Sequence, residues 1–89
     1  MGVSAEQTDR ITEDIAAQVR AKRGLRNISC DELADRSGLS RPIMARIEQA
    51  EREIGMPELY KICGVLRVDP RDILQAAQDA LRKSPGPTS

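Results

Sequence analysis

The chain has 89 residues, of which 39% are hydrophobic and 31% are charged, and its 14 basic and 14 acidic side chains balance to zero net charge. This length supports one domain with a modest core and is too short for two. With no histidine and a single aromatic residue, Tyr60, the composition excludes an aromatic core, Ser-His or Cys-His catalysis and a histidine-bound metal ion.

The first predicted helix begins near Thr8 or Asp9 and runs to about Leu25. Apolar residues recur in it every four positions and define a buried stripe, namely Ile11, Ile15 and Val19. Asn27 can adopt the left-handed conformation that closes a helix. Residues 1–7 lack periodicity and are expected to form a mobile tail.

Two short helices joined by a tight turn follow. Ser29 is a good N-cap, and Glu32 lies three residues later, at the capping-box spacing. Gly38 can supply the left-handed conformation that ends the first of these helices. Ser40 caps the second, and Pro42 falls in its first turn, where a missing N–H is tolerated. This arrangement is a helix-turn-helix.

The second helix of this motif has two faces at the 3.6-residue spacing. The apolar face, which must be buried, consists of Ile43, Met44 and Ile47. The opposite face carries the candidate DNA-binding residues Arg41, Pro42, Ala45, Arg46 and Gln49. Guanidinium and amide groups pair with phosphates and with base edges in a major groove. Residues 18–46 also carry seven basic side chains against three acidic ones, which fits a groove-facing surface as well as a solvated one.

Two more helices complete an all-α chain. The fourth runs from Gly55 to about Leu66, with an inward stripe predicted at Met56, Leu59, Ile62, Cys63 and Leu66. The Asp69-Pro70 pair opens the fifth, which continues to about Lys83. The apolar side of that helix consists of Ile73, Leu74, Ala77 and Leu81.

The ordered series of motifs resembles the lambdoid Cro/repressor family, also called the Xre family. The similarity is carried by Ser29 to Leu39, by the Ile47-Glu48 pair and by the run from Leu59 to Asp69. It extends without a gap from about Ile15 to Leu74, which is most of the chain. The resemblance implies a five-helix, lambda-repressor-like DNA-binding domain that binds operator DNA, usually as a dimer, and regulates transcription.

The resemblance also implies roles for single residues. In the family, the arginine at the position of Arg23 pairs with the glutamate at the position of Glu48, and this structural ion pair would fix the first helix against the recognition helix. Glu48 borders the buried side of its helix, where a lone charge would be costly. Cys30 stands in the DNA-contacting set where the family often has Gln, and a thiol braces a phosphate poorly.

The loop over residues 50–54 departs most from the family. Ala50 stands where a Gly is common, and Glu51 and Glu53 place negative charge near the expected DNA backbone. Only Arg52 is left to contact a phosphate.

A dimer is expected because one such domain reads only about five or six base pairs, too few among ~10⁶ competing sites. Leu74, Ala77 and Leu81 of the last helix are the predicted interface. The alternative is that this turn packs back on the first helix. The expected domain spans residues 8–83, followed by a disordered C-terminal tail at 84–89.

The predicted function is a sequence-specific transcriptional regulator, a repressor of the phage or antitoxin type, whose third helix reads the major groove of double-stranded DNA. The alternative is a protein-interaction module on the same fold, with loop 50–54 contacting a protein partner. No enzyme, cofactor or metal is expected, since no glycine-rich phosphate loop or ligand cluster is present and Cys30 and Cys63 read as reduced thiols. With no membrane-spanning run or signal peptide, the cytoplasm is the expected location.

Overall fold

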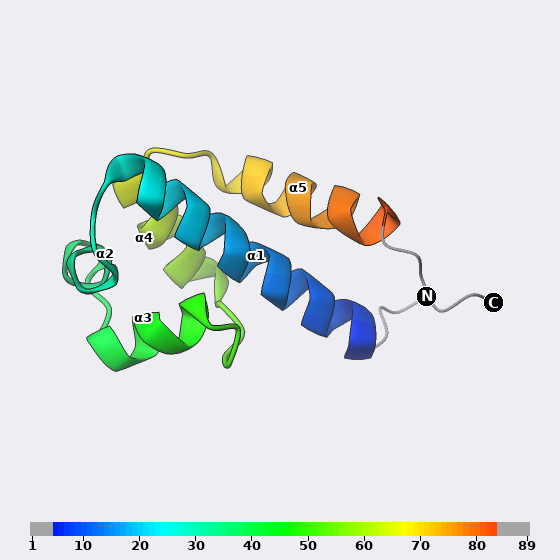
Figure 1. The fold of residues 1–89 in the computed structure, drawn as a ribbon, viewed down its shortest axis with the longest axis horizontal. Helices are drawn as coiled ribbons and strands as arrows, with labels where there is room; N and C mark the ends of the chain where they lie inside the picture. Colours follow the sequence, from blue (N-terminus) through cyan, green and yellow to red (C-terminus); the bar gives the residue numbers. More distant parts are fainter. Residues whose placement is uncertain (1–4, 84–89) are drawn as a thin grey trace.

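The computed structural model describes residues 5–83, which form five α-helices and no strand (Figure 1). These are α1 (Ala5–Arg26), α2 (Cys30–Ser37), α3 (Arg41–Glu48), α4 (Met56–Leu66) and α5 (Pro70–Lys83). The long helix α1 is the axis of the molecule, with α5 beside it along one edge, α3 along the other and α2 at one end (Figure 1). The predicted all-α, five-helix fold is confirmed.

One aliphatic core joins all five helices. Its members include large side chains with almost no exposed surface, namely Val19, Leu33, Met44, Ile47, Leu59, Ile62, Leu66 and Ile73. Tyr60, the single aromatic residue, lies on the surface. A core of this kind gains its stability from burying many small apolar groups, each contributing about 0.8 kcal/mol per CH₂.

Four of the helices end in the same way, with one residue in the left-handed conformation. The φ angles are 58° at Asn27, 71° at Gly38, 58° at Ala50 and 58° at Arg67. After each of them, the next backbone N–H donates to the carbonyl five residues earlier, at N···O distances of 3.4, 3.0, 2.9 and 3.0 Å, respectively. This geometry satisfies carbonyl groups that the helix leaves unpaired and reverses the chain within two residues.

The helix-turn-helix begins with caps that the sequence predicts. Ser29 Oγ accepts a hydrogen bond from the N–H of Glu32 at 3.0 Å, and Ser40 Oγ accepts one from the N–H of Ile43 at 3.3 Å. The Glu32 carboxylate pairs with Arg36 at 2.7 Å, one turn further along α2. Capping by both serines fixes where α2 and α3 start, and therefore which face of each is buried.

The expected start of the first helix is wrong by about one turn. The helix α1 begins at Ala5, so residues 5–7 belong to it and not to a tail. Glu6 lies in the first turn, where a carboxylate interacts favourably with the helix dipole. The tails predicted for residues 1–4 and 84–89 lie outside the described residues.

The inward stripe predicted for α4 is also wrong at its first member. Met56 is 50% exposed because α4 begins before it reaches the core, and the first buried residue of the helix is Leu59. The other predicted members of this stripe are buried, namely Ile62, Cys63 and Leu66.

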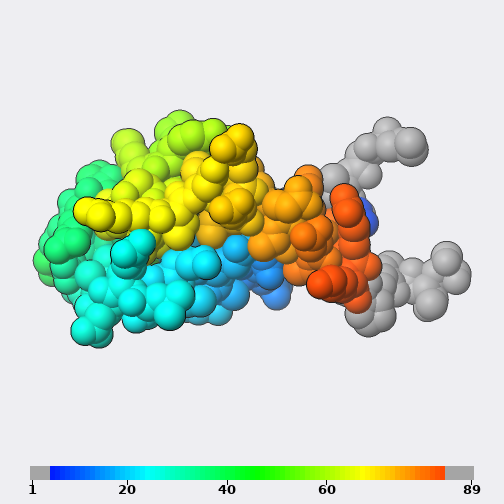
Figure 2. Space-filling view, turned by 90° about the horizontal axis from the view of Figure 1, so that it is seen from above, coloured from blue at the N-terminus to red at the C-terminus, as the bar shows by residue number. Residues whose placement is uncertain are grey.

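The helix α5 lies along α1, as the space-filling view shows (Figure 2). Ala77 is 2% exposed, and Leu74 packs against the core of the same chain. Ala77 therefore has little surface left for the dimer interface predicted for it, because this small side chain packs inside the domain. Leu81 remains half-buried and lines an open hollow of about 320 Å³ between the two helices.

Candidate nucleic-acid interface

The face that α3 presents to solvent is determined by what it buries. Met44 and Ile47 are almost fully buried, and the partly buried Ile43 packs against the same core. The opposite side of the helix therefore points outward. Arg41, Pro42, Arg46 and Gln49 are exposed there and Ala45 is half-buried, so the predicted DNA-binding residues of α3 share one face.

Arg46 is a free cation on this face. Within residues 5–83, its guanidinium makes no hydrogen bond or ion pair, and the side-chain amide of Gln49 makes none either. Both groups are available to a ligand without first breaking an intramolecular contact. A guanidinium and an amide at this spacing are suited to phosphates and base edges.

Arg41, in contrast, is held by two carboxylates of α2. Its Nε and Nη2 donate to the two oxygens of Asp35, at 3.2 and 2.8 Å, and its Nη1 donates to Asp31 at 3.4 Å. The bond from Arg41 lowers the pKa of the Asp35 carboxyl below its usual value and raises the pKa of Arg41. Both groups are therefore charged at neutral pH.

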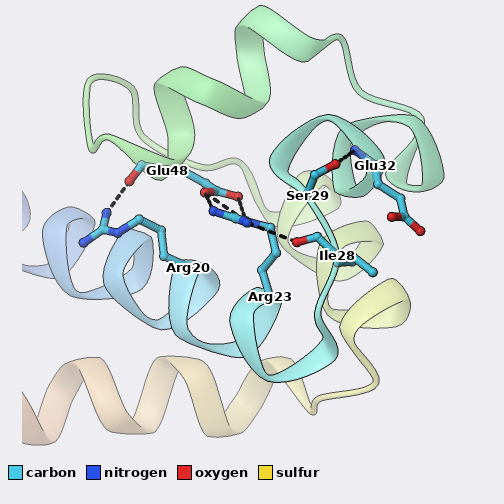
Figure 3. A network of polar contacts seen from close by, with 6 residues as sticks. All are labelled: Arg20, Arg23, Ile28, Ser29, Glu32 and Glu48. Atoms are coloured by element: carbon cyan, nitrogen blue, oxygen red, sulfur yellow. Dashed lines mark hydrogen bonds and ion pairs between the residues drawn. The ribbon is translucent and has the colours of Figure 1, made fainter.

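A partly buried network fixes α3 against α1 (Figure 3). Arg23 Nε and Nη2 donate to Glu48 Oε2 and Oε1, each at 2.9 Å, and Arg23 Nη1 donates to the carbonyl of Ile28 at 3.1 Å. Arg20 adds a hydrogen bond from Nη1 to the backbone carbonyl of Glu48. The ion pair expected from the sequence is thus present, and Arg20 was not anticipated.

This network explains how a carboxylate can be buried beside the core. Glu48 is 4% exposed, and both of its carboxylate oxygens are satisfied by one bidentate guanidinium. The hydrogen bond to Glu48 raises the pKa of Arg23 above its usual value. Since α3 is anchored at its C-terminal end in this way, its exposed face has a fixed orientation relative to α1.

Cys30 lies next to this ion pair and faces inward. The residue is partly buried and packs against the core, and burial together with the nearby Glu48 raises the pKa of its thiol. Burial likewise raises the pKa of Cys63 to about 11. Both cysteines are therefore protonated thiols at neutral pH. A neutral, half-buried Cys30 offers little to a phosphate, so its predicted place among DNA-contacting residues is the weakest of the set.

Arg52, the one basic residue of the loop between α3 and α4, is already in an ion pair. Arg52 Nη1 pairs with Glu58 Oε1 at 2.8 Å, and the same oxygen accepts the N–H of Gly55 at 2.8 Å. The hydrogen bonds from Arg52 and then Gly55 lower the pKa of Glu58. The side chain expected to contact phosphate therefore closes the loop onto the start of α4.

Next to this loop is a polar hollow of about 420 Å³ with an acidic lining. It is formed by side chains of α1 and of the loop, namely Asp9, Thr12, Glu13, Ala50, Glu51, Arg52 and Glu53. Four of these are carboxylates, and the guanidinium of Arg52 is already paired. The surface beside this loop is therefore negative.

Sequence reasoning missed the carboxylates around Arg41. Asp31 and Asp35 are four residues apart, so their position on one face of α2 could be read from the spacing. That this face meets the first residue of α3 depends on the angle of the turn. Among residues 5–83, no group of three or more potential metal-binding side chains comes together. None of the helices in that range combines the length and hydropathy needed to cross a membrane.

Comparison with known proteins gives a consistent result. A family model described as the Cro/C1-type HTH DNA-binding domain matches residues 18–79. Two solved structures of the clp gene regulator ClgR from Corynebacterium glutamicum are similar in fold, each with 24% sequence identity. One has a TM-score of 0.74 and covers 81% of this chain and 77% of its own. The other has a TM-score of 0.71 and covers 79% and 91%. A search of curated protein sequences gave no significant match.

Proposed function

The chain belongs to the Cro/C1-type HTH DNA-binding domain family, and from that premise we propose that this DNA-binding regulator is a repressor, of the phage or antitoxin type, that reads operator DNA with α3. The family is one of DNA-binding regulators, and we propose no catalytic activity. The proposed ligand is the major groove of double-stranded DNA, which is wide enough to admit an α-helix.

The observation that carries this proposal is the pairing of a buried and an exposed face on α3. Met44, Ile47 and Glu48 lock one side of the helix into the domain. The other side presents Arg46 and Gln49 with no competing partner among the described residues. From Arg41 to its C-cap Gln49, α3 spans about 12 Å at a rise of about 1.5 Å per residue, enough to reach several base pairs.

The test is a selection of bound sequences from a random pool of duplex DNA, followed by affinity measurements on the selected site. Arg46→Ala should weaken binding by about 1–3 kcal/mol and relax the preference at one base position. Arg82→Ala serves as the control, because it removes a guanidinium from the far end of α5. If sequence preference survives the combined loss of Arg41 and Arg46, α3 is not the reading helix.

We also propose that two copies bind one operator. A dimer places two reading helices about 34–36 Å apart, one turn of DNA, so the operator should be a near-palindrome with half-sites at that spacing. The surface of α5 around Leu81 is the proposed contact. This interface is smaller than the one predicted from the sequence, because Ala77 is buried within the domain.

A protein-interaction module remains the second candidate, and the acidic hollow beside loop 50–54 favours it. Asp9, Glu13, Glu51 and Glu53 line that hollow. Such a surface suits a basic protein segment better than a phosphate backbone. Salt dependence separates the two functions. For DNA binding, counterion release makes the logarithm of the binding constant fall with the logarithm of the salt concentration, with a slope of about −0.9 per phosphate contact. A module that does not use DNA should show no such slope with duplex DNA.

A further inference from the structure

The contact between Arg41 and the two aspartates of α2 bears on which DNA groups Arg41 can bind. Arg41 is the first residue of α3, and Asp31 and Asp35 lie one turn apart on the face of α2 beside it. The guanidinium contacts both oxygens of Asp35 and one oxygen of Asp31. This is the densest cluster of charged contacts on the helix-turn-helix surface within residues 5–83.

Stability does not account for this cluster. The side chains of Arg41, Asp31 and Asp35 are 58%, 61% and 56% exposed, respectively. Ion pairs at such exposure contribute little to folding, because water and salt screen them. The two carboxylates also carry a penalty, since they bring negative charge to a surface that would approach phosphates.

The number of N–H groups on Arg41 indicates how many donors remain for a DNA base. A guanidinium carries five N–H donors. Two are used by Asp35 and one by Asp31, which leaves two. Two is the number that a bidentate contact to O6 and N7 of guanine needs.

We propose that Asp35, assisted by Asp31, is a specificity-determining positioning residue that holds the guanidinium of Arg41 for guanine in the major groove and away from phosphate. The inference rests on the proposed reading of DNA by α3. Free arginine side chains pair readily with any phosphate, which adds affinity without sequence information. With two carboxylates around one guanidinium, the cluster is net negative, so a phosphate gains little from it. One N–H on each terminal nitrogen, Nη1 and Nη2, is left for the O6 and N7 of a guanine. Specificity increases because the wrong contact is disfavoured.

The experiment uses Asp35→Asn with the full chain. The base position read by Arg41 is first identified as the one whose preference is lost in Arg41→Ala. Binding is then measured to the selected duplex, to the duplex with guanine replaced at that position, and to a duplex of unrelated sequence. In Asp35→Asn, discrimination at this position should fall by roughly three- to tenfold, a part of what one bidentate contact supplies. Affinity for the unrelated duplex should rise.

Glu32→Gln is the matched control. It removes the same charge from the same helix, but Glu32 pairs with Arg36 at 2.7 Å and not with Arg41. It should raise affinity for unrelated DNA without changing discrimination. Asp35→Asn made in the Arg41→Ala background should have no effect on discrimination at this position, because the group it positions is gone. Thermal unfolding of each variant confirms that the domain is folded.

Three outcomes would overturn the inference. Unchanged discrimination in Asp35→Asn, with the preference lost in Arg41→Ala, contradicts the positioning role alone and leaves the proposed function standing. A loss in Glu32→Gln equal to that in Asp35→Asn assigns the effect to charge and not to position. Absence of any sequence preference in the unaltered protein contradicts the proposed function and this inference with it.

Discussion

Arg23 and Glu48 form a bidentate ion pair that joins α1 to the end of α3, with Nε–Oε2 and Nη2–Oε1 distances of 2.9 Å. The side chain of Glu48 is 5% exposed and that of Arg23 is 24% exposed. A carboxylate removed from water to this extent needs a full complement of donors, and Arg23 provides them. The pair therefore links the stability of the domain to the orientation of the candidate reading helix.

Breaking this pair from the arginine side should destabilise the protein strongly. Arg23→Met leaves the Glu48 carboxylate buried without a partner, and the free energy of unfolding should fall by about 3 kcal/mol. The double variant Arg23→Met with Glu48→Met should be less destabilised than the single one, because no charge remains buried. Urea denaturation of the two variants measures both values. A double variant less stable than Arg23→Met would contradict the argument.

Ala50 is strained in the native chain and should be improved by glycine. Its φ of 58° lies in the left-handed region, which costs an L-residue roughly 1–2 kcal/mol. Glycine removes that strain but loses roughly 0.5–1 kcal/mol through its more flexible unfolded state. Ala50→Gly should therefore raise the free energy of unfolding by about 0.5–1 kcal/mol. Ala45→Gly, the same change inside α3, should lower it, and a stability loss in Ala50→Gly would contradict the strain.

Much of the fold could be predicted from local sequence because helix ends carry their own signals. Ser29 and Ser40 cap their helices by accepting a hydrogen bond from the N–H three residues later in the sequence. Asn27 and Gly38 end their helices by adopting a positive φ angle. Such features need no tertiary information. The first turn of α1 and the exposure of Met56 could not be predicted, because both depend on where each helix meets the core.

The site was predictable only in part, for a related reason. The pairing of Arg23 with Glu48 follows from the family register, and the exposed face of α3 follows from helical periodicity. The partners of Arg41 and Arg52 lie across a turn and across a loop, at sequence separations of six to ten residues. Sequence spacing alone does not place those side chains within hydrogen-bonding distance.

The acidic loop should oppose DNA binding. Glu51 and Glu53 line the hollow between loop 50–54 and α1, and Arg52 is held by Glu58. Converting both glutamates to lysine should tighten binding to duplex DNA and make its salt dependence steeper, by up to about 0.9 in slope for each new phosphate contact. Asp72→Lys combined with Asp79→Lys makes the same charge change on α5 and is the control.

The same loop variant distinguishes the two candidate functions. If the loop contacts a basic protein segment, reversing its charge should abolish that interaction, whatever happens to DNA binding. Equal DNA affinity for the loop variant and the unaltered protein would remove the loop from the DNA interface.

Dimer formation should depend on Leu81. With Ala77 inside the core and Leu74 packed against it, the remaining apolar surface of α5 lies around Leu81 and Ala80, at the edge of the hollow of about 320 Å³ next to α1. Apolar residues at the rim of an open hollow are suited to a second copy, and small alanines permit close approach. In sedimentation experiments, Leu81→Asp should therefore shift the protein from dimer to monomer and weaken binding to a two-half-site duplex more than to one half-site. Ala76→Asp, on an exposed part of the same helix, should leave assembly unchanged. A monomer in both the unaltered protein and Leu81→Asp, on DNA as well as off it, would show that α5 makes no such contact.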